Sequence, residues 1–226
     1  MTYKWNYLTL TTDQKIKKDE LTKEIQLDPV LIELLLKRGI SSVEEAHKFL
    51  YPSLSDLHDP FLLPDMEKAI MRIEQAIGNK ERILIYGDYD VDGTTAVSLV
   101  YKFLRKITNN IDYYIPDRYD EGYGISIQGI DYAVETGVKL IISLDCGIKA
   151  IKKVAYAKEH GIDFIICDHH MPDEELPDAV AVVDAKRADS IYPYNELSGC
   201  GVGFKLVHAF SIRNGLSFSD IEPLLD

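Results

Sequence analysis

Three aspartates stand at alternate positions in one short stretch of this chain. Asp88, Asp90 and Asp92 follow an apolar run at 83–85 and the glycine at position 87. An apolar run that ends at a glycine and continues into a helical pattern is typical of a buried strand that leads into a helix. Three carboxylates crowded at such a turn repel one another unless a cation lies among them, so the stretch indicates a divalent metal site. An acidic surface loop without an ion is the alternative.

The elements that must position these aspartates follow from the pattern after residue 82, where apolar runs alternate with helical periodicity. Strands are predicted at 82–87, 111–115, 139–144, 162–167 and 179–183, and helices at 94–106, 126–136, 148–160 and 202–213. Continuous apolar strands that alternate with helices of this length predict an α/β fold. We therefore expect an open, mainly parallel sheet of about five strands with helices on both faces.

The first 75 residues lack this alternation and have helical patterns instead. Asp28 before Pro29 predicts the start of one helix, and Ser42 with Glu45 has the spacing of a capping box that starts another. Asp65 is expected to cap a third helix. We expect a helical N-terminal segment at 1–75, without chemistry of its own, and an α/β domain at 76–226.

Polar side chains also follow the other predicted strands. Arg118 follows the second strand, Asp145 the third, and Asp168, His169 and His170 the fourth. Ligands of an open parallel sheet bind outside the carboxyl ends of its strands. Because all these groups reach the same edge as the three aspartates, the sequence predicts one metal-dependent site for phosphate chemistry.

The residue types at this edge indicate which metal would bind. Carboxylates with one or two imidazoles and no thiolate suit Mn²⁺ or Mg²⁺. The number of carboxylates exceeds what one ion needs, so we expect two ions, about 3.5–4 Å apart, that share one carboxylate. Such a pair lowers the pKa of a shared water and stabilises the attacking and leaving oxygens of a displacement at phosphorus.

The single residues also have structural explanations. Asp145 could cap the helix predicted at 148–160. His170 alone could be a structural histidine. Beside His169 we expect it to donate to a phosphate oxygen or to act as a general acid, because adjacent side chains rarely face the same ion. Asp168 is expected to orient an imidazole through a hydrogen bond.

Two further features at this edge allow a functional and a structural interpretation. Arg118 could clamp a phosphate through two hydrogen bonds or be an ordinary surface charge. The glycine-rich run at 198–206 could receive a phosphate at the start of a helix or allow close helix packing. Cys146 and Cys167 flank two of the expected ligands, yet they need no role beyond that of small buried hydrophobic residues.

Composition limits the function classes. The chain has 226 residues and a formal net charge of −12, from 25 basic and 37 acidic residues. This charge disfavours binding to a phosphate backbone, unless bound metals neutralise part of it or the main contacts lie in another segment. No stretch approaches the ~18 apolar residues of a membrane span, so we expect no membrane partner. The lack of a secretory signal and of CxxC spacing predicts a cytoplasmic location.

Several motifs resemble those of a known superfamily. The first three motifs of the DHH phosphoesterases are similar to three segments here, GDYDVDG at 87–93, SLDCG at 143–147 and CDHH at 167–170. Within this superfamily the chain resembles the RecJ exonucleases in three more segments, at 49–70, 116–124 and 182–206. The resemblance extends over nearly the whole chain.

The resemblance implies which residues bind the metals. It assigns the two-metal centre to Asp90, Asp92, Asp145 and His169, with Asp145 as the bridge. Asp88 would lie in or next to this group of ligands. Bound Mn²⁺ or Mg²⁺ ions, two in number, are the cofactors that the resemblance implies.

The resemblance also implies which residues contact substrate. His170 would contact the scissile phosphate, and Arg118 would hold a substrate phosphate. The turn that contains Gly199, Gly201 and Gly203 would hold another. The catalytic group implied in this way is His169, His170, Asp168 and Asp145.

The chain departs from the family pattern at two positions. Tyr86 stands where some members have a histidine, so one metal would have fewer protein ligands. Asp184 stands where asparagine is common. The family's fourth-motif aspartate would lie beyond Asp226, followed by the DHHA1 and oligonucleotide-binding domains. We therefore expect an N-terminal fragment that is poorly active by itself.

The RecJ exonucleases imply a function as well. They hydrolyse single-stranded DNA in the 5′ to 3′ direction, in DNA repair and recombination. The expected partners are single-stranded DNA, a single-stranded-DNA-binding protein and a repair helicase. The alternatives are another DHH phosphoesterase, acting on oligonucleotides, cyclic dinucleotides or pyrophosphate, and a nuclease-inactive DNA-binding scaffold.

Overall fold

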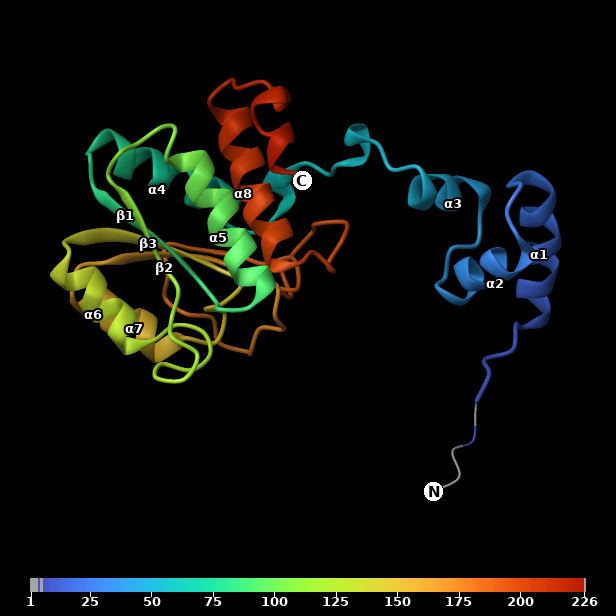
Figure 1. The fold of residues 1–226 in the computed structure, drawn as a ribbon, viewed down its shortest axis with the longest axis horizontal. Helices are drawn as coiled ribbons and strands as arrows, with labels where there is room; N and C mark the ends of the chain where they lie inside the picture. The colour runs from blue at the N-terminus through green and yellow to red at the C-terminus, as the bar shows by residue number, and fades with distance from the viewer. Residues whose placement is uncertain (1–3, 5, 226) are drawn as a thin grey trace. The chain divides into compact units, whose positions relative to one another are not determined.

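The computed structural model describes residue 4 and residues 6–225 (Figure 1). The chain divides into two compact units, one that ends at Leu57 and one that begins at His58. The smaller unit is helical, and the larger unit contains the sheet. Among the described residues, no helix has both the length and the apolar character needed to cross a membrane.

The smaller unit consists of α1 (Thr12–Glu24), α2 (Pro29–Lys37), α3 (Val43–Leu50) and the 3₁₀ turn η1 (Leu54–Asp56). Asp28 caps α2, and Ser42 with Glu45 forms the capping box of α3, as predicted. Helix α1 has no predicted counterpart, although Thr11 and Gln14 form a capping box at its start. The core of this unit is formed by Leu21, Ile25, Ile32, Leu35, Leu36 and Ala46.

The larger unit alternates strands and helices along the chain. It begins with the 3₁₀ turn η2 (Pro60–Leu62) and α4 (Met66–Gly78). The strands are β1 (Arg82–Gly87), β2 (Ile111–Tyr114), β3 (Val138–Leu144), β4 (Asp163–Cys167) and β5 (Ala181–Val183). The helices between and after them are α5 (Val91–Leu104), α6 (Ile127–Glu135), α7 (Ile151–Glu159) and α8 (Gly199–Arg213), followed by η3 (Phe218–Asp220) and η4 (Glu222–Leu224).

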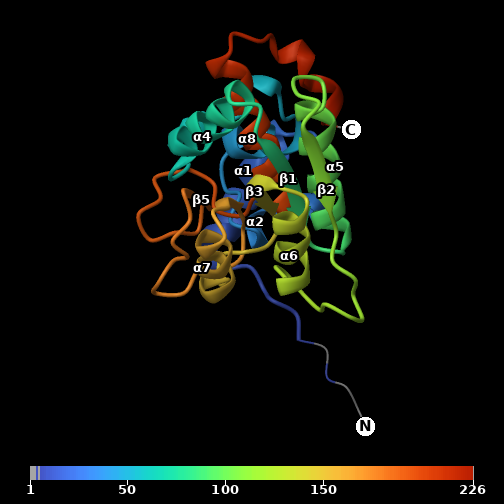
Figure 2. The ribbon, with the colours of Figure 1, turned by 90° about the vertical axis from the view of Figure 1, so that its left-hand side faces the viewer.

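The strands form one five-stranded sheet in the order β2-β1-β3-β4-β5, and every neighbouring pair is parallel. Helices α6 and α7 cover one face, and α4, α5 and α8 cover the other (Figure 1, Figure 2). This arrangement confirms the predicted fold class. The strand order changes direction between β1 and β3, which is the place where open α/β sheets bind their ligands.

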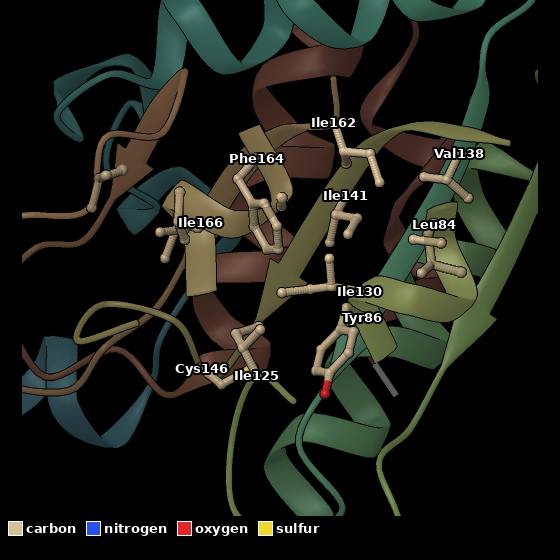
Figure 3. Packing of buried hydrophobic residues seen from close by; sticks show 14 of the residues in the cluster. Leu84, Tyr86, Ile125, Ile130, Val138, Ile141, Cys146, Ile162, Phe164 and Ile166 are labelled. Atoms are coloured by element: carbon tan, nitrogen blue, oxygen red, sulfur yellow. The ribbon is translucent and has the colours of Figure 1, made fainter. Parts of the chain in front are cut away.

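The core between the sheet and helices α6 and α7 fixes the positions of the strands relative to one another. Leu84 and Tyr86 of β1 pack beside Ile141 of β3, Phe164 of β4 and Ile130 of α6 (Figure 3). The side chains of these five residues are at most 2 % exposed. Close packing of this kind holds the carboxyl ends of β1, β3 and β4 in fixed positions relative to one another.

The division between the two units differs from the boundary expected at 75–76, which falls inside α4. This helix belongs to the larger unit because its apolar face packs against β5 and α8. Its Arg72 side chain also donates hydrogen bonds to Asp163 at the start of β4 and to Glu81. A helical pattern alone does not show which unit a helix packs against.

Some helix starts and caps differ from their predictions. Helix α5 begins at Val91 because Asp90 accepts a hydrogen bond from the amide of Gly93 and so caps the helix. Helix α8 begins at Gly199, after its cap Ser198. Asp65 precedes α4 as expected, but its side chain makes no cap hydrogen bond and instead pairs with Lys68 and Arg187.

Candidate metal centre

The first wall of the site is the turn between β1 and α5. Asp88 is fully buried, and its Oδ2 atom has no hydrogen-bond partner among the residues that the structure describes. Burial, assisted by the charge of Asp90, raises the pKa of Asp88. Gly93 allows the turn to close, because a Cβ atom there would lie 2.4 Å from the backbone oxygen of Asp88. The turn therefore holds a carboxylate in a position that favours a nearby cation.

Asp92 connects this turn to the start of α8. Its carboxylate accepts hydrogen bonds from the amides of Gly199 and Cys200, both at 2.7 Å. Amides at a helix N-terminus carry partial positive charge and stabilise a carboxylate. Asp92 therefore fixes the position of α8 over the site. The sequence prediction missed this contact, which joins residues more than 100 positions apart.

Asp145, at the end of β3, lies at the centre of the site. It is 1 % exposed and adopts a left-handed backbone conformation, with φ 61°. Burial, together with the charges of Asp92 and Asp90, raises the pKa of Asp145 to about 8. Its Oδ1 atom accepts no hydrogen bond, although it lies 3.1 Å from Nε2 of His169. A buried oxygen of this kind is suited to ligate a cation.

Helix α8 comes very close to Asp145. A Cβ atom at Gly199 would lie 2.5 Å from Oδ1 of Asp145. Only glycine fits this position. Asp145 does not cap the following helix, because α7 begins later, at Ile151 after Ala150. The capping alternative is therefore wrong.

The two histidines after β4 make different contacts. Nε2 of His169 lies 3.1 Å from Asp145 and 3.6 Å from Asp92. Nδ1 of His170 lies 2.7 Å from Oδ1 of Asp168, and its Nε2 lies 3.0 Å from the hydroxyl of Tyr123. The structure thus brings together ligand atoms of Asp145, His169 and His170 within 4.8 Å of one another.

Asp168 organises the loop that carries both histidines. Besides His170, it accepts hydrogen bonds from the amides of His169, at 2.7 Å, and Ile148, at 2.9 Å. Burial acts to raise the pKa of Asp168, but these hydrogen bonds, above all that from His170, hold it below its ordinary value. The hydrogen bond to Asp168 in turn raises the pKa of His170. The imidazole that Asp168 orients is therefore that of His170.

The donor atoms at this edge fit a divalent cation. They are carboxylate oxygens and imidazole nitrogens, which Mn²⁺ and Mg²⁺ accept. The unpartnered oxygens of Asp88 and Asp145 are buried, so water does not compensate them fully. Asp90 and Asp92 lie close enough to raise the pKa of Asp145. A cation among these groups would remove the repulsion that they otherwise suffer.

Arg118 lies at the rim of the site rather than among the carboxylates. Its guanidinium carbon is 5.2 Å from the centre of the Tyr89 ring. Tyr89 contacts Tyr123 edge-on at 6.3 Å, and Tyr123 contacts His170 in the same way at 6.1 Å. A row of aromatic rings thus extends from Arg118 to the histidines. Tyr123 had no predicted role, and its only signal was an aromatic residue between two glycines.

The glycines of the 198–206 run have different surroundings. The amide of Gly199 donates to Asp92, and that of Gly201 donates to its own helix cap, Ser198. Gly203 is buried against Val100 and Leu144, where it permits close packing of α8. These amides are engaged within the protein, which fits the packing alternative better than a phosphate-binding turn.

The two positions that depart from the family pattern are both buried. The hydroxyl of Tyr86 donates to the carbonyl of Gly124 and accepts from the amide of Ser126, so Tyr86 anchors the loop that carries Tyr123. Asp184 follows β5 and has one carboxylate oxygen without a partner. Burial raises the pKa of Asp184 to about 7.

Comparisons with known proteins identify a family and several relatives that are similar to this chain. A family model described as the DHH family, N-terminal domain, matches residues 82–223. The chain is 46% identical over 193 residues to the single-stranded-DNA-specific exonuclease RecJ of Bacillus subtilis (strain 168), covering 85% of this chain and 25% of that protein. The chain thus spans about a quarter of the length of this relative.

Two solved structures are similar as well. A crystal structure of exonuclease RecJ bound to manganese has a TM-score of 0.62 and 30% identity, covering 69% of this chain and 39% of that chain. RecJ from Thermus thermophilus in complex with Mn²⁺ has a TM-score of 0.70 and 25% identity, covering 90% of this chain and 28% of that chain. Both likenesses extend over most of this chain.

Proposed function

The chain belongs to the DHH family, and on that premise we propose that it hydrolyses phosphodiester bonds of single-stranded DNA with divalent metal ions. The observation that supports this most directly is the pair of buried, unpartnered carboxylate oxygens on Asp88 and Asp145. The similarity to single-stranded-DNA-specific exonucleases supports the choice of substrate. The proposed reaction proceeds 5′ to 3′ and releases mononucleotides, in DNA repair and recombination.

The proposed metal ligands are the residues around Asp145. Asp88, Asp90, Asp92, Asp145 and His169 would hold Mn²⁺ or Mg²⁺, with Asp145 between two ions. Such ions, when bound, supply Lewis-acid chemistry by lowering the pKa of water and stabilising charge on the phosphate. Manganese in two similar structures supports Mn²⁺.

His170 would contact the scissile phosphate. Asp168 accepts the hydrogen bond from Nδ1, so the proton on that nitrogen is fixed and Nε2 remains for substrate. In the structure Nε2 faces the hydroxyl of Tyr123, and a phosphate oxygen would take the place of that hydroxyl. The raised pKa of His170 favours the protonated ring, which can donate a proton to the phosphate or the leaving oxygen.

The rim of the site suits a single strand. Tyr89 and Tyr123 offer ring faces and edges to unpaired bases, and Arg118 offers a guanidinium to a phosphate. Tyr119, which follows Arg118 in the sequence, is 93% exposed. A duplex hides its base faces, so stacking of this kind favours single strands.

The proposal also includes protein partners and a location. A single-stranded-DNA-binding protein and a repair helicase follow from the family resemblance. The free cysteines, Cys146, Cys167 and Cys200, fit a reducing compartment such as the cytoplasm. A pull-down with each purified partner, with and without DNA, would test the two protein contacts.

Metal binding is the first test. Mn²⁺ titration followed by electron paramagnetic resonance should show binding that Asp145→Asn weakens strongly. Asp178→Asn is a matched control, because that carboxylate is exposed and paired with Lys158 on the surface. If Mn²⁺ does not bind, or if Asp145→Asn binds it like the unchanged chain, the nuclease-inactive scaffold becomes the better explanation.

Substrate choice is the second test. A single-stranded oligonucleotide labelled at its 5′ end should release labelled mononucleotides in Mn²⁺, with enzyme in excess to detect slow turnover. A duplex of the same sequence should be cleaved much more slowly. Faster cleavage of dinucleotides than of long strands would instead point to a different phosphoesterase of the family.

A further inference from the structure

A cavity opens beside His170. Its volume is about 370 Å³, within the range of small-ligand pockets. The walls come from the loop that carries Tyr123 and from the segment between β3 and α7. The lining residues include Tyr123, Ile125, Ile148, Lys149, Ala150 and Lys153.

The wall of the cavity is mostly apolar, although Lys149, Lys153, Asp168 and His170 also line it. Ile125, Cys146 and Ile148 are each 2 % exposed and form its floor. Lys153 donates a hydrogen bond to the carbonyl of Ile125, which ties α7 to the opposite wall. The aromatic ring of Tyr123 stands at the mouth, in contact with His170. Such a preformed apolar slot with an aromatic edge suits a flat ring.

Lys149 places an exposed cation at the mouth of the cavity. Lys149 pairs with Asp173 at 3.0 Å, but both side chains are more than half exposed. Exposed pairs of this kind contribute little, so Lys149 can exchange Asp173 for an anionic group of a ligand. A positive charge here stands out on a chain with a net charge of −12.

We propose that this cavity binds the base and sugar of the deoxynucleotide whose phosphate lies at His170, with Lys149 on a neighbouring phosphate. A ring in the slot packs against Ile125, Ile148 and Ala150 and lies edge-on to Tyr123. Because the slot has mostly apolar walls, it accepts different bases without reading their sequence. The role of the cavity in catalysis rests on the proposed nuclease function, whereas binding of a nucleotide does not.

Nucleotide binding to the metal-free chain tests the proposal without any catalysis. The ¹⁵N-labelled full chain is titrated with dAMP in the presence of a chelator, and amide NMR signals are followed. The amides of Gly147, Ile148 and Ala150 should shift, while those of α4 should not. The Kd for dAMP should rise at least about tenfold in Ala150→Phe, which fills the slot. The Kd for the dinucleotide pdApdA, which has the second phosphate that dAMP lacks, should rise about threefold in Lys149→Ala.

Controls separate the base from the phosphate. Lys152→Ala removes a neighbouring exposed lysine that does not line the cavity and should leave the Kd for dAMP unchanged. 2-Deoxyribose 5-phosphate, which lacks the base, should bind more weakly than dAMP. Equal binding of the two would overturn the base pocket, as would shifts confined to residues outside the cavity. Amide spectra of each variant verify that it folds, and Lys149→Ala remains informative if Ala150→Phe does not.

DNA cleavage then links the cavity to the substrate. An oligonucleotide whose 5′-terminal residue is abasic should show a higher KM than the intact strand with the unchanged chain, but the same KM with Ala150→Phe. Cleavage of DNA without dAMP shifts at the cavity would refute the pocket and leave the nuclease function intact. Amide shifts at the cavity without DNA cleavage would refute the nuclease function and leave the pocket intact.

Discussion

Buried charged groups have neighbours of opposite charge at one edge of the sheet and of like charge at the other. At the amino edge, Arg72 of α4 donates to Asp163, at 2.7 Å, and to Glu81, at 2.6 Å. Burial acts to lower the pKa of Arg72, but these two carboxylates raise it above its ordinary value. At the carboxyl edge, Asp145 is buried among other carboxylates, and its pKa is raised to about 8.

The difference fits a structural role for the amino edge and supports the metal site proposed at the carboxyl edge. The amino edge pairs opposite charges supplied by the chain itself, so loss of one partner would leave a buried charge uncompensated. The carboxyl edge gathers like charges and leaves buried oxygens on Asp88 and Asp145 without partners. An arrangement that costs stability in this way is typical of a site that binds a cation.

The largest expected effect breaks the amino edge. Arg72→Met should lower the free energy of unfolding by about 3 kcal/mol, because Glu81 and Asp163 lose their buried partner. Urea denaturation measures the change. Arg213→Met removes an exposed pair with Glu67 and should cost less than about 0.5 kcal/mol. Equal losses in the two variants would mean that Arg72 contributes no more than a surface charge.

The next effect concerns the close approach of α8 to the carboxyl edge. Gly199→Ala should cost about 2 kcal/mol and weaken Mn²⁺ binding, because its Cβ would overlap the Asp145 carboxylate. Gly201→Ala is the control, since the nearest atom to its Cβ would be 3.5 Å away. Thermal unfolding and Mn²⁺ titration measure both effects. If the two alanines behave alike, the contact between α8 and Asp145 is not close in solution.

The carboxyl edge itself should gain stability when a charge is removed. The raised pKa of Asp145 means that the folded chain holds this proton up to about pH 8, whereas the unfolded chain releases it near pH 4. The free energy of unfolding therefore falls between these pH values. Asp145→Asn should remove this fall and stabilise the metal-free chain at pH 8 by about 1–2 kcal/mol.

Metal should reverse that gain. Saturating Mn²⁺ should raise the melting temperature of the unchanged chain and have little effect on Asp145→Asn. Calorimetry of both chains at pH 8, with chelator and with Mn²⁺, measures which chain is the more stable in each condition. A metal-free Asp145→Asn chain less stable than the unchanged one would show that the carboxylate supports the fold.

The smallest expected effect comes from a buried cation that has no close carboxylate partner. Lys205 is 3% exposed and donates to the carbonyl of His58 at 2.7 Å. Burial lowers the pKa of Lys205 to about 8, and Asp59 offsets this only in part. The unfolded chain keeps this proton up to about pH 10.4, so the free energy of unfolding should rise between pH 8 and that value.

Lys205→Met tests this contribution. The variant should lack this rise in the free energy of unfolding, which we expect to be about 1 kcal/mol. It should keep the contributions that Arg72 and Asp145 make to stability. Urea denaturation at pH 8, 9 and 10 measures the slope. An unchanged slope in Lys205→Met would assign the rise to other groups.

Local sequence signals predicted much of the fold. The strand at 82–87 has the predicted bounds, and the other four strands lie within one or two residues of theirs. Apolar runs and cap residues carry this information because they act over a few neighbouring positions. The boundary expected at 75–76 differs from the division between Leu57 and His58, because the packing of α4 on β5 and α8 depends on residues far away in the sequence.

The site divides in the same way. The order of strands and turns brings Asp145 and His169 to one edge, as the sequence predicted. The contact of Asp92 with α8, the hydrogen bond between Tyr123 and His170, and the tight fit of Gly199 against Asp145 had no local signal. Each of these joins elements that are distant in the sequence and meet only after the sheet has formed.

The sequence by itself determined which chemical groups reach the carboxyl edge, because a parallel strand must deliver the residue that follows it to that edge. Only the tertiary structure decided how those groups differ. It buries Asp145 without a hydrogen-bond partner for its Oδ1 atom and gives Asp168 to His170. Burial and hydrogen-bond partners depend on the packing of whole elements, and these set the charge that each carboxylate can carry.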